Sequence, residues 1–130
     1  MSEAFRRIAV ELLRPDAQNG DWLAWASNQL SHAFIGSILT STALLFNHGV
    51  WISVISATLF YALIKEFPDF LRDPRWATAR DSTQDSLFVF GGALLIAAVA
   101  LTQIWIFTFA LVAVLTGLGL GVWQRVKVKV

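Results

Sequence analysis

The side chains of this sequence that are best suited to chemistry lie within or beside its apolar stretches. They are one histidine and four carboxylates: His32, Glu66, Asp69, Asp81 and Asp85. Together they make a mixed nitrogen and oxygen ligand set that suits Zn²⁺, Mn²⁺ or Mg²⁺. Without a metal, carboxylates held close together raise one another's pKa, and an imidazole acts as a general acid or base. We therefore take all five as candidate catalytic residues, and His32, Glu66 and Asp85 as candidate ligands of a divalent metal cofactor.

The spacing of these residues predicts that they share helical faces. Asn28, His32 and Gly36 recur every four residues, which places them along one side of a helix. The acidic residues are also about one turn apart, Glu66 with Asp69 and Asp81 with Asp85. Gly36 and either Gly91 or Gly92 would let two helices approach closely, which would draw His32 towards Asp85.

Three arginines between the second and third apolar stretches could bind an anionic group. Arg72, Arg75 and Arg80 are suited to bidentate contacts with phosphate, and we predict that they, with Asn28, bind substrate.

Each of these residues also has a structural explanation. Asp81 with Ser82 could cap a helix whose N-terminus favours carboxylates, and Glu66 could pair with an arginine of the connecting segment. Asn28 could hydrogen-bond across a helix bundle. For the set as a whole, a functional polar site is the favoured interpretation, because ionisable groups at membrane depth are costly and usually functional.

The elements that carry these residues are predicted to cross a membrane. Of 130 residues, 56% are hydrophobic and 15% charged, too apolar for a small water-soluble monomer. A span takes about 20 helical residues. We predict an all-α polytopic membrane domain with four transmembrane helices, at 22–46, 50–67, 86–103 and 104–123. Residues 1–15 have helical apolar spacing and predict an amphipathic helix on the membrane surface.

Tryptophans and basic residues orient the predicted helices. All six tryptophans fall near a predicted helix end or in a connection, and Trp105 supports the break at 102–104, which has neither glycine nor proline. The connections at 47–49 and 102–104 carry no lysine or arginine, whereas the termini and the middle connection are basic. The positive-inside rule therefore predicts a multi-pass protein of the inner (cytoplasmic) membrane with both termini in the cytoplasm.

Composition excludes several classes of function. A formal net charge of +1 does not support nucleic-acid binding, and the absence of cysteine excludes disulfides and iron–sulfur clusters. Membrane lipids are the expected partners, and a homo-oligomer or a larger membrane complex is compatible with the sequence.

The order of these motifs resembles the VanZ-like family of small bacterial membrane proteins and related short phage and bacterial membrane proteins. The resemblance rests on Asn28-x3-His32-x3-Gly36, Lys65-Glu66-x2-Asp69, and Asp81-x3-Asp85 before Gly91-Gly92, over about residues 28–92. The sequence departs from the family in having Asn28 and Gln29 before the histidine, and Asp69 where many members have glutamine. The resemblance implies a role in the bacterial envelope or in glycopeptide tolerance.

Two functional hypotheses follow from the sequence. In the first, a polar site open to the cytoplasmic leaflet binds a metal or acts on an anionic lipid or isoprenoid phosphate. In the second, the chain is a non-enzymatic structural, accessory or pore-forming (holin-like) membrane protein whose polar residues hold the helices together. Ion or proton transport is less favoured, because the predicted fourth span has no ionisable residue.

Overall fold

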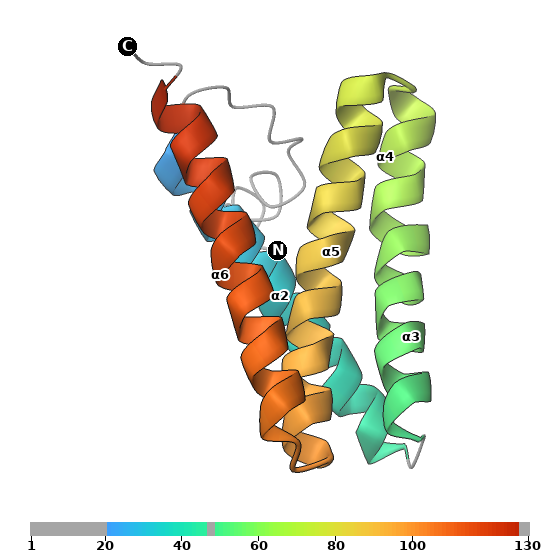
Figure 1. Cartoon of the computed structure of the whole chain (residues 1–130). Helices are drawn as coiled ribbons and strands as arrows, with labels where there is room; N and C mark the ends of the chain where they lie inside the picture. Colours follow the sequence, from blue (N-terminus) through green and yellow to red (C-terminus); the bar gives the residue numbers. More distant parts are fainter. Residues whose placement is uncertain (1–20, 47–48, 128–130) are drawn as a thin grey trace, which may run out of the picture.

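The computed structural model describes residues 21–46 and 49–127, which form helices joined by short turns (Figure 1). The elements are α2 (Trp22–Leu45), α3 (Val50–Tyr61), the π-helical turn η1 (Ala62–Glu66), α4 (Phe67–Arg72), α5 (Trp76–Ala100) and α6 (Ile104–Lys127). The predicted all-α fold is confirmed for this part of the chain. The helix predicted at 1–15 lies outside the described residues.

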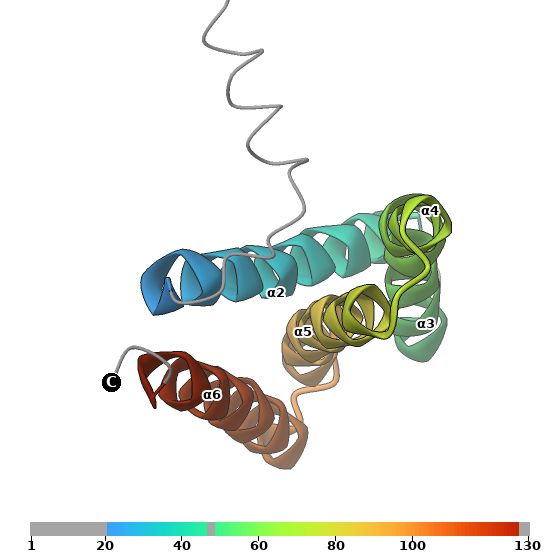
Figure 2. The same ribbon diagram turned by 90° about the horizontal axis from the view of Figure 1, so that it is seen from above.

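Helix α5 is the centre of the bundle. It packs against α2, α3 and α6, and α2 is its most extensive neighbour. Seen from above, α5 lies between α6 on one side and α3 and α4 on the other, while α2 runs obliquely across the back (Figure 2). Residues on several faces of α5 are therefore buried against different helices.

Within the part of the chain that the structure describes, three helices are long and apolar enough to cross a membrane: Val50–Arg72, Trp76–Ala100 and Ile104–Lys127. Helix α2 is equally long, with 24 residues, but its amide, imidazole and hydroxyl side chains make it less apolar. The second predicted span was too short, because α3, η1 and α4 continue through Pro68 to Arg72 as one rod. The third begins at Trp76, ten residues before the predicted start at residue 86.

The predicted N-terminus of α2 agrees with the structure, whereas that of α5 does not. The side chain of Asp21 accepts hydrogen bonds from the backbone N–H groups of Leu23 and Ala24, both at 3.1 Å, so it is the predicted N-cap. Because α5 begins at Trp76, Asp81 lies in the second turn of that helix, and the interpretation of Asp81 as a cap is wrong.

The turn between α5 and α6 falls where the sequence predicted it, although it contains no glycine. Thr102 has a φ of 53°, in the left-handed region that usually takes glycine at a helix end. The backbone N–H of Gln103 donates to Ala98 and that of Thr102 to Val99, the Schellman pattern. Trp105 Nε1 donates to Gln103 Oε1 at 2.8 Å, which ties the start of α6 to the turn.

Helices α2 and α5 touch backbone to backbone at two glycines. A Cβ added to Gly36 would overlap the carbonyl of Val89, and one added to Gly92 would overlap the carbonyl of Ala33. The hydroxyl of Ser37 also donates to the carbonyl of Gly92 at 3.1 Å. The predicted close approach of these two helices is confirmed.

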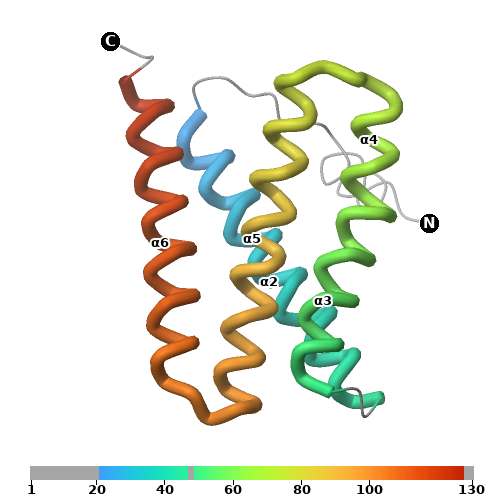
Figure 3. Tube along the Cα trace, turned by 45° about the vertical axis from the view of Figure 1, so that its right-hand side comes forward, coloured from blue at the N-terminus to red at the C-terminus, as the bar shows by residue number. Residues whose placement is uncertain are grey.

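The charged residues gather in one half of the bundle. We call the end formed by Asp21, the segment 73–75 and the last turn of α6 the charged end (Figure 3). The connection at 101–103, at the opposite end, is uncharged. This polarity agrees with the alternation of basic and uncharged connections in the sequence.

Candidate functional site

Three buried polar side chains meet where α2 crosses α5. Gln29 Nε2 donates a hydrogen bond of 2.7 Å to Oδ1 of Asp85. Nδ1 of His32 lies 3.3 Å from the same oxygen, at ion-pair distance but without the alignment of a hydrogen bond. Gln29 and His32 are three residues apart on α2 and so share the face that contacts α5. The predicted approach of His32 to Asp85 is confirmed.

A second buried pair lies on the neighbouring helix. Tyr61 donates its hydroxyl proton to Oε1 of Glu66 at 2.6 Å. In a regular α-helix, residues five apart point in different directions, but the wider turn η1 between them brings these two side chains together. Pro68 explains the turn, because it has no N–H and its ring crowds the carbonyl four residues earlier.

The aromatic rings of His32 and Tyr61 connect the group of three with this pair. Their centroids are 5.6 Å apart in an edge-on arrangement. We call the five side chains the polar network: Gln29, His32, Tyr61, Glu66 and Asp85. All five are buried, with exposed fractions between 1% and 7%, so their charges and dipoles act on one another with little screening by water.

The polar network keeps unused hydrogen-bonding capacity. Among the buried side chains that the structure describes, Gln29 Oε1 and His32 Nδ1 have no hydrogen-bond partner. An unsatisfied buried group costs free energy, about 1–3 kcal/mol, and calls for an explanation. At His32, a small rotation of the imidazole would turn the 3.3 Å contact with Asp85 into a charge-assisted hydrogen bond.

The remaining predicted carboxylates lie outside the polar network. Asp69 is half-buried and pairs with Lys65 one turn earlier and, at 3.6 Å, with Arg72. Asp81 is half-buried on α5 and interacts electrostatically with Arg125 of α6. The structure thus brings together three of the five candidate catalytic residues, His32, Glu66 and Asp85. Asp69 and Asp81 lie outside this cluster.

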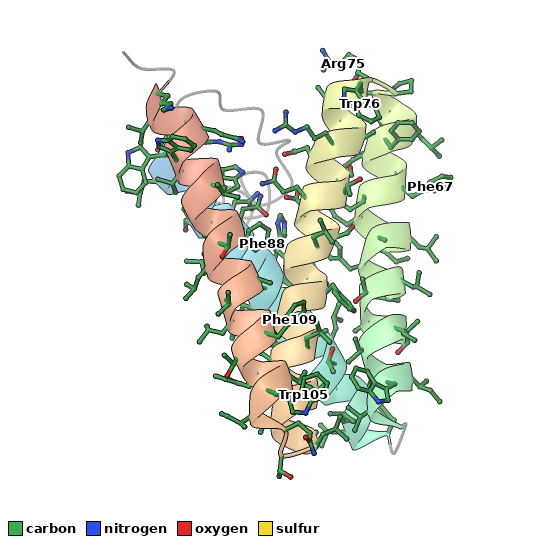
Figure 4. The ribbon with its side chains drawn as sticks, in the orientation of Figure 1. Phe67, Arg75, Trp76, Phe88, Trp105 and Phe109 are labelled. Atoms are coloured by element: carbon green, nitrogen blue, oxygen red, sulfur yellow. The ribbon has the colours of Figure 1, made fainter. Side chains whose placement is uncertain are left out.

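The predicted substrate-binding residues are spread over the charged end. Arg75 donates to Asp73 from Nε at 2.6 Å, and this bond lowers the pKa of the Asp73 carboxyl below its usual value. Arg72 is exposed at the end of α4, and Arg80 is exposed on α5. Asn28 is half-buried on α2, beside Gln29 in the chain. Figure 4 marks Arg75 and Trp76 at the charged end, and Trp105 at the other.

The donors predicted for a metal do not form one ligand set. Within residues 21–46 and 49–127, no group of three or more His, Asp or Glu side chains is arranged to hold a metal ion. His32 and Asp85 are adjacent, whereas Glu66 Oε1 is engaged by Tyr61.

Glu66 connects the polar network with the surface. It lines a shallow opening of about 280 Å³ between α4 and α5, together with Phe67 and Phe70 of α4. Hydroxyl-bearing side chains of α5 line the other side: Ser82, Thr83 and Ser86. Glu66 is the member of the polar network that lines this opening, and it is 6% exposed.

Two members of the polar network were missed at the level of sequence. Gln29 is an amide next to the candidate Asn28, and Tyr61 is the only tyrosine in the chain. The spacing of Gln29 and His32 could have indicated Gln29. Tyr61 could not have been indicated in this way, because its contact with Glu66 depends on the π-helical turn.

Comparison of the chain with models of protein families, with curated proteins and with solved structures finds no match.

Proposed function

We propose that this chain is a four-span membrane protein whose polar network carries out acid–base chemistry on an anionic lipid or isoprenoid phosphate from the cytoplasmic leaflet. The observation that carries the proposal is the placement of His32 between the carboxylate of Asp85 and the Tyr61–Glu66 pair, in the interior of an apolar bundle. Ionisable groups at membrane depth are costly and are usually kept for function.

The residues of the polar network have complementary roles in this proposal. Asp85 orients His32 and stabilises the imidazolium that forms when His32 accepts a proton. Gln29 holds Asp85 in place by its 2.7 Å hydrogen bond. Glu66 faces both Tyr61 and the opening between α4 and α5, so it is the group through which a proton passes between the polar network and a ligand.

The proposed ligand class follows from the position of the opening. Phe67 and Phe70 give it an apolar side that suits a lipid chain. Arg72 ends the helix that carries both phenylalanines and is largely exposed, which makes it a candidate partner for a phosphate. The order of motifs that resembles the VanZ-like family supports a role in the bacterial envelope.

Helix α2 is proposed as a fourth span, although it is less apolar than the other three. It is long enough to cross a membrane, and its buried residues Gln29 and His32 face Asp85 of α5. Its outward face carries large exposed apolar side chains, among them Leu30, Phe34 and Ile38. A helix that buries its polar groups against a neighbour is compatible with lipid on the other face.

The experiment uses the protein in vesicles that contain a polyprenyl phosphate and phosphatidic acid, with lipid products identified by mass spectrometry. Wild type is expected to convert one of the two lipids. His32→Gln is expected to lower the rate by about 100-fold or more, as for loss of a general acid or base. Asp69→Asn, a carboxylate outside the polar network, is the matched control and is expected to retain the rate. Unchanged lipids with wild type, or an unchanged rate with His32→Gln, would overturn the proposal.

A non-enzymatic, structural function is the second candidate, and one observation favours it. Both carboxylates of the polar network already have partners in the protein, Asp85 with Gln29 and Glu66 with Tyr61. A purely structural polar network predicts that variants lose folding stability without a separate loss of activity. Thermal unfolding of His32→Gln in the same vesicles distinguishes the two, because a variant that folds normally and has lost the reaction contradicts the structural candidate.

A further inference from the structure

A groove of about 700 Å³ runs between α5 and α6, on the side of α5 that faces away from the polar network. The two helices meet at the turn 101–103 and diverge towards the charged end (Figure 1). Gly91 of α5 and Gly117 of α6 are among its lining residues, and Phe88 and Phe109 lie between the helices along it (Figure 4). The volume falls within the range of small-molecule pockets, about 300–1,000 Å³.

The groove changes from apolar to cationic along its length. Its deeper part is lined by aliphatic and aromatic side chains, and its part nearest the charged end by Arg80, Gln84 and Gln124. Arg125 of α6 lies within electrostatic range of Arg80 and of Asp81. Of these three charged groups Arg80 lines the groove, so this end of the groove carries a positive charge. Trp76, 84% exposed, borders the same end, as expected where a membrane meets water.

We propose that this groove binds one anionic, phosphate-bearing lipid, with an acyl or isoprenoid chain between α5 and α6 and the phosphate at Arg80. An apolar groove on a membrane-spanning helix pair is filled by hydrocarbon chains, so its selectivity comes from its polar end. Arg80 supplies the planar donors that bind a phosphate in a bidentate manner, and Gln84 and Gln124 add amide donors. Charge complementarity therefore selects a phosphate-bearing lipid over a zwitterionic one.

This groove is distinct from the polar network, although Ala79 and Thr83 of α5 line both the groove and the opening beside Glu66. None of the five members of the polar network lines the groove, because Asp85 faces α2 whereas Gln84 faces α6. The proposal concerns lipid binding alone and does not depend on any reaction. Its failure would leave the proposed function standing, and the reverse also holds.

The test uses photo-crosslinking in phosphatidylcholine vesicles that contain a little phosphatidic acid with a photoactivatable acyl chain. Crosslinks to wild type are expected on groove-lining residues of α5 and α6. Arg80→Gln is expected to lower crosslinking by about tenfold, which corresponds to the loss of one hydrogen bond to a charged group. Ala113→Phe, which fills the groove, is expected to lower it at least as much.

Matched controls distinguish this site from general lipid contact. Lys127→Gln removes an exposed cation at the same end of the bundle, and Val112→Phe enlarges an exposed residue of α6, and neither residue lines the groove. Both are expected to crosslink as wild type does. A photoactivatable phosphatidylcholine is expected to label the groove about tenfold less than phosphatidic acid, and glycerol phosphate is expected not to compete. Equal labelling of all variants, equal labelling by the two lipids, or displacement by glycerol phosphate would overturn the proposal. Arg80 is exposed, so Arg80→Gln is expected to fold. Its comparison with wild type remains a test of the proposal if Ala113→Phe does not fold.

Discussion

His32 and Asp85 face each other 3.3 Å apart in the interior of the bundle because two glycines remove the side chains that would separate their helices. Gly36 lies one turn after His32 on α2, and Gly92 lies two turns after Asp85 on α5. The backbones touch at these positions, and His32 and Asp85 lie one to two turns closer to the charged end. The geometry of the site therefore depends on residues that have no chemistry of their own.

Adding one methyl group at either glycine is expected to push α2 and α5 apart. The Cβ of Gly36→Ala would meet the backbone of Val89, and that of Gly92→Ala the backbone of Ala33, neither of which can rotate away. We expect each variant to lower the free energy of unfolding in detergent by about 1–3 kcal/mol, the usual cost of overpacking. Chemical denaturation followed by circular dichroism measures this change.

Gly119→Ala is the control for this prediction. A Cβ at Gly119 meets no atom within 4 Å, and alanine is the better helix former, so stability should rise by about 0.5–1 kcal/mol. If Gly36→Ala and Gly92→Ala behaved like Gly119→Ala, the close contact of α2 and α5 would be refuted.

Trp25 is expected to respond to a substitution on α6. Unlike the exposed tryptophans, it is 3% exposed, packs edge-on against Phe88 and carries Arg125 at 4.1 Å from its ring centroid. Its ring also covers Gly121, so Gly121→Ala should displace it and expose it to an aqueous fluorescence quencher. Gly117→Ala is the milder comparison, because its Cβ would lie 3.3 Å from the ring edge of Phe88. An unchanged quenching profile for Gly121→Ala would contradict the packing of Trp25 on α6.

Much of the fold could be predicted from the sequence, because it depends on local signals. The helices and their order were predicted from the length of the apolar stretches, from Asp21 as an N-cap and from Trp105 beside the break at 101–103. The errors lie where a local signal was ambiguous. The second helix was predicted to end at residue 67, but Pro68 sits in the first turn of α4, directly after a π-helical turn. The polar residues 76–85 hid the first turns of α5. Trp25 lies near the start of α2, as predicted, but its burial could not be predicted, because it depends on the room that Gly121 of α6 leaves for the ring.

The candidate site could be predicted only in part. The pairing of His32 with Asp85 followed from glycine and histidine spacing, since both depend on the regular period of a helix. The pairing of Tyr61 with Glu66 depends on a local departure from that period, and Asp69 is taken by Lys65 at the ordinary four-residue spacing. Spacing predicts contacts within a regular helix, but the choice between competing partners is made by the packing of the whole bundle.

The hydrogen bond between Tyr61 and Glu66 is expected to stabilise the π-helical turn. Tyr61→Phe removes the donor and leaves the Glu66 carboxylate buried with one partner fewer, which should cost about 1–3 kcal/mol. In a Glu66→Leu background the same substitution should cost much less, because the acceptor is already absent. Denaturation of the four proteins of this double-mutant cycle measures the coupling. Additive effects of the two substitutions would mean that the bond contributes nothing to stability.

The orientation of the chain can be tested with single cysteines, since the native sequence has none. Pro74→Cys lies at the charged end and Gly49→Cys at the opposite end, where a Cβ meets only the tip of Ile52 at 3.9 Å. A membrane-impermeant maleimide on intact cells should label Gly49→Cys at once, and Pro74→Cys only after the membrane is permeabilised, because basic segments stay in the cytoplasm. Trp22→Cys, at the start of α2, should behave like Pro74→Cys if α2 is a fourth span. Labelling of Trp22→Cys from outside would show that α2 does not cross, and the reverse pattern for the first two variants would overturn the orientation.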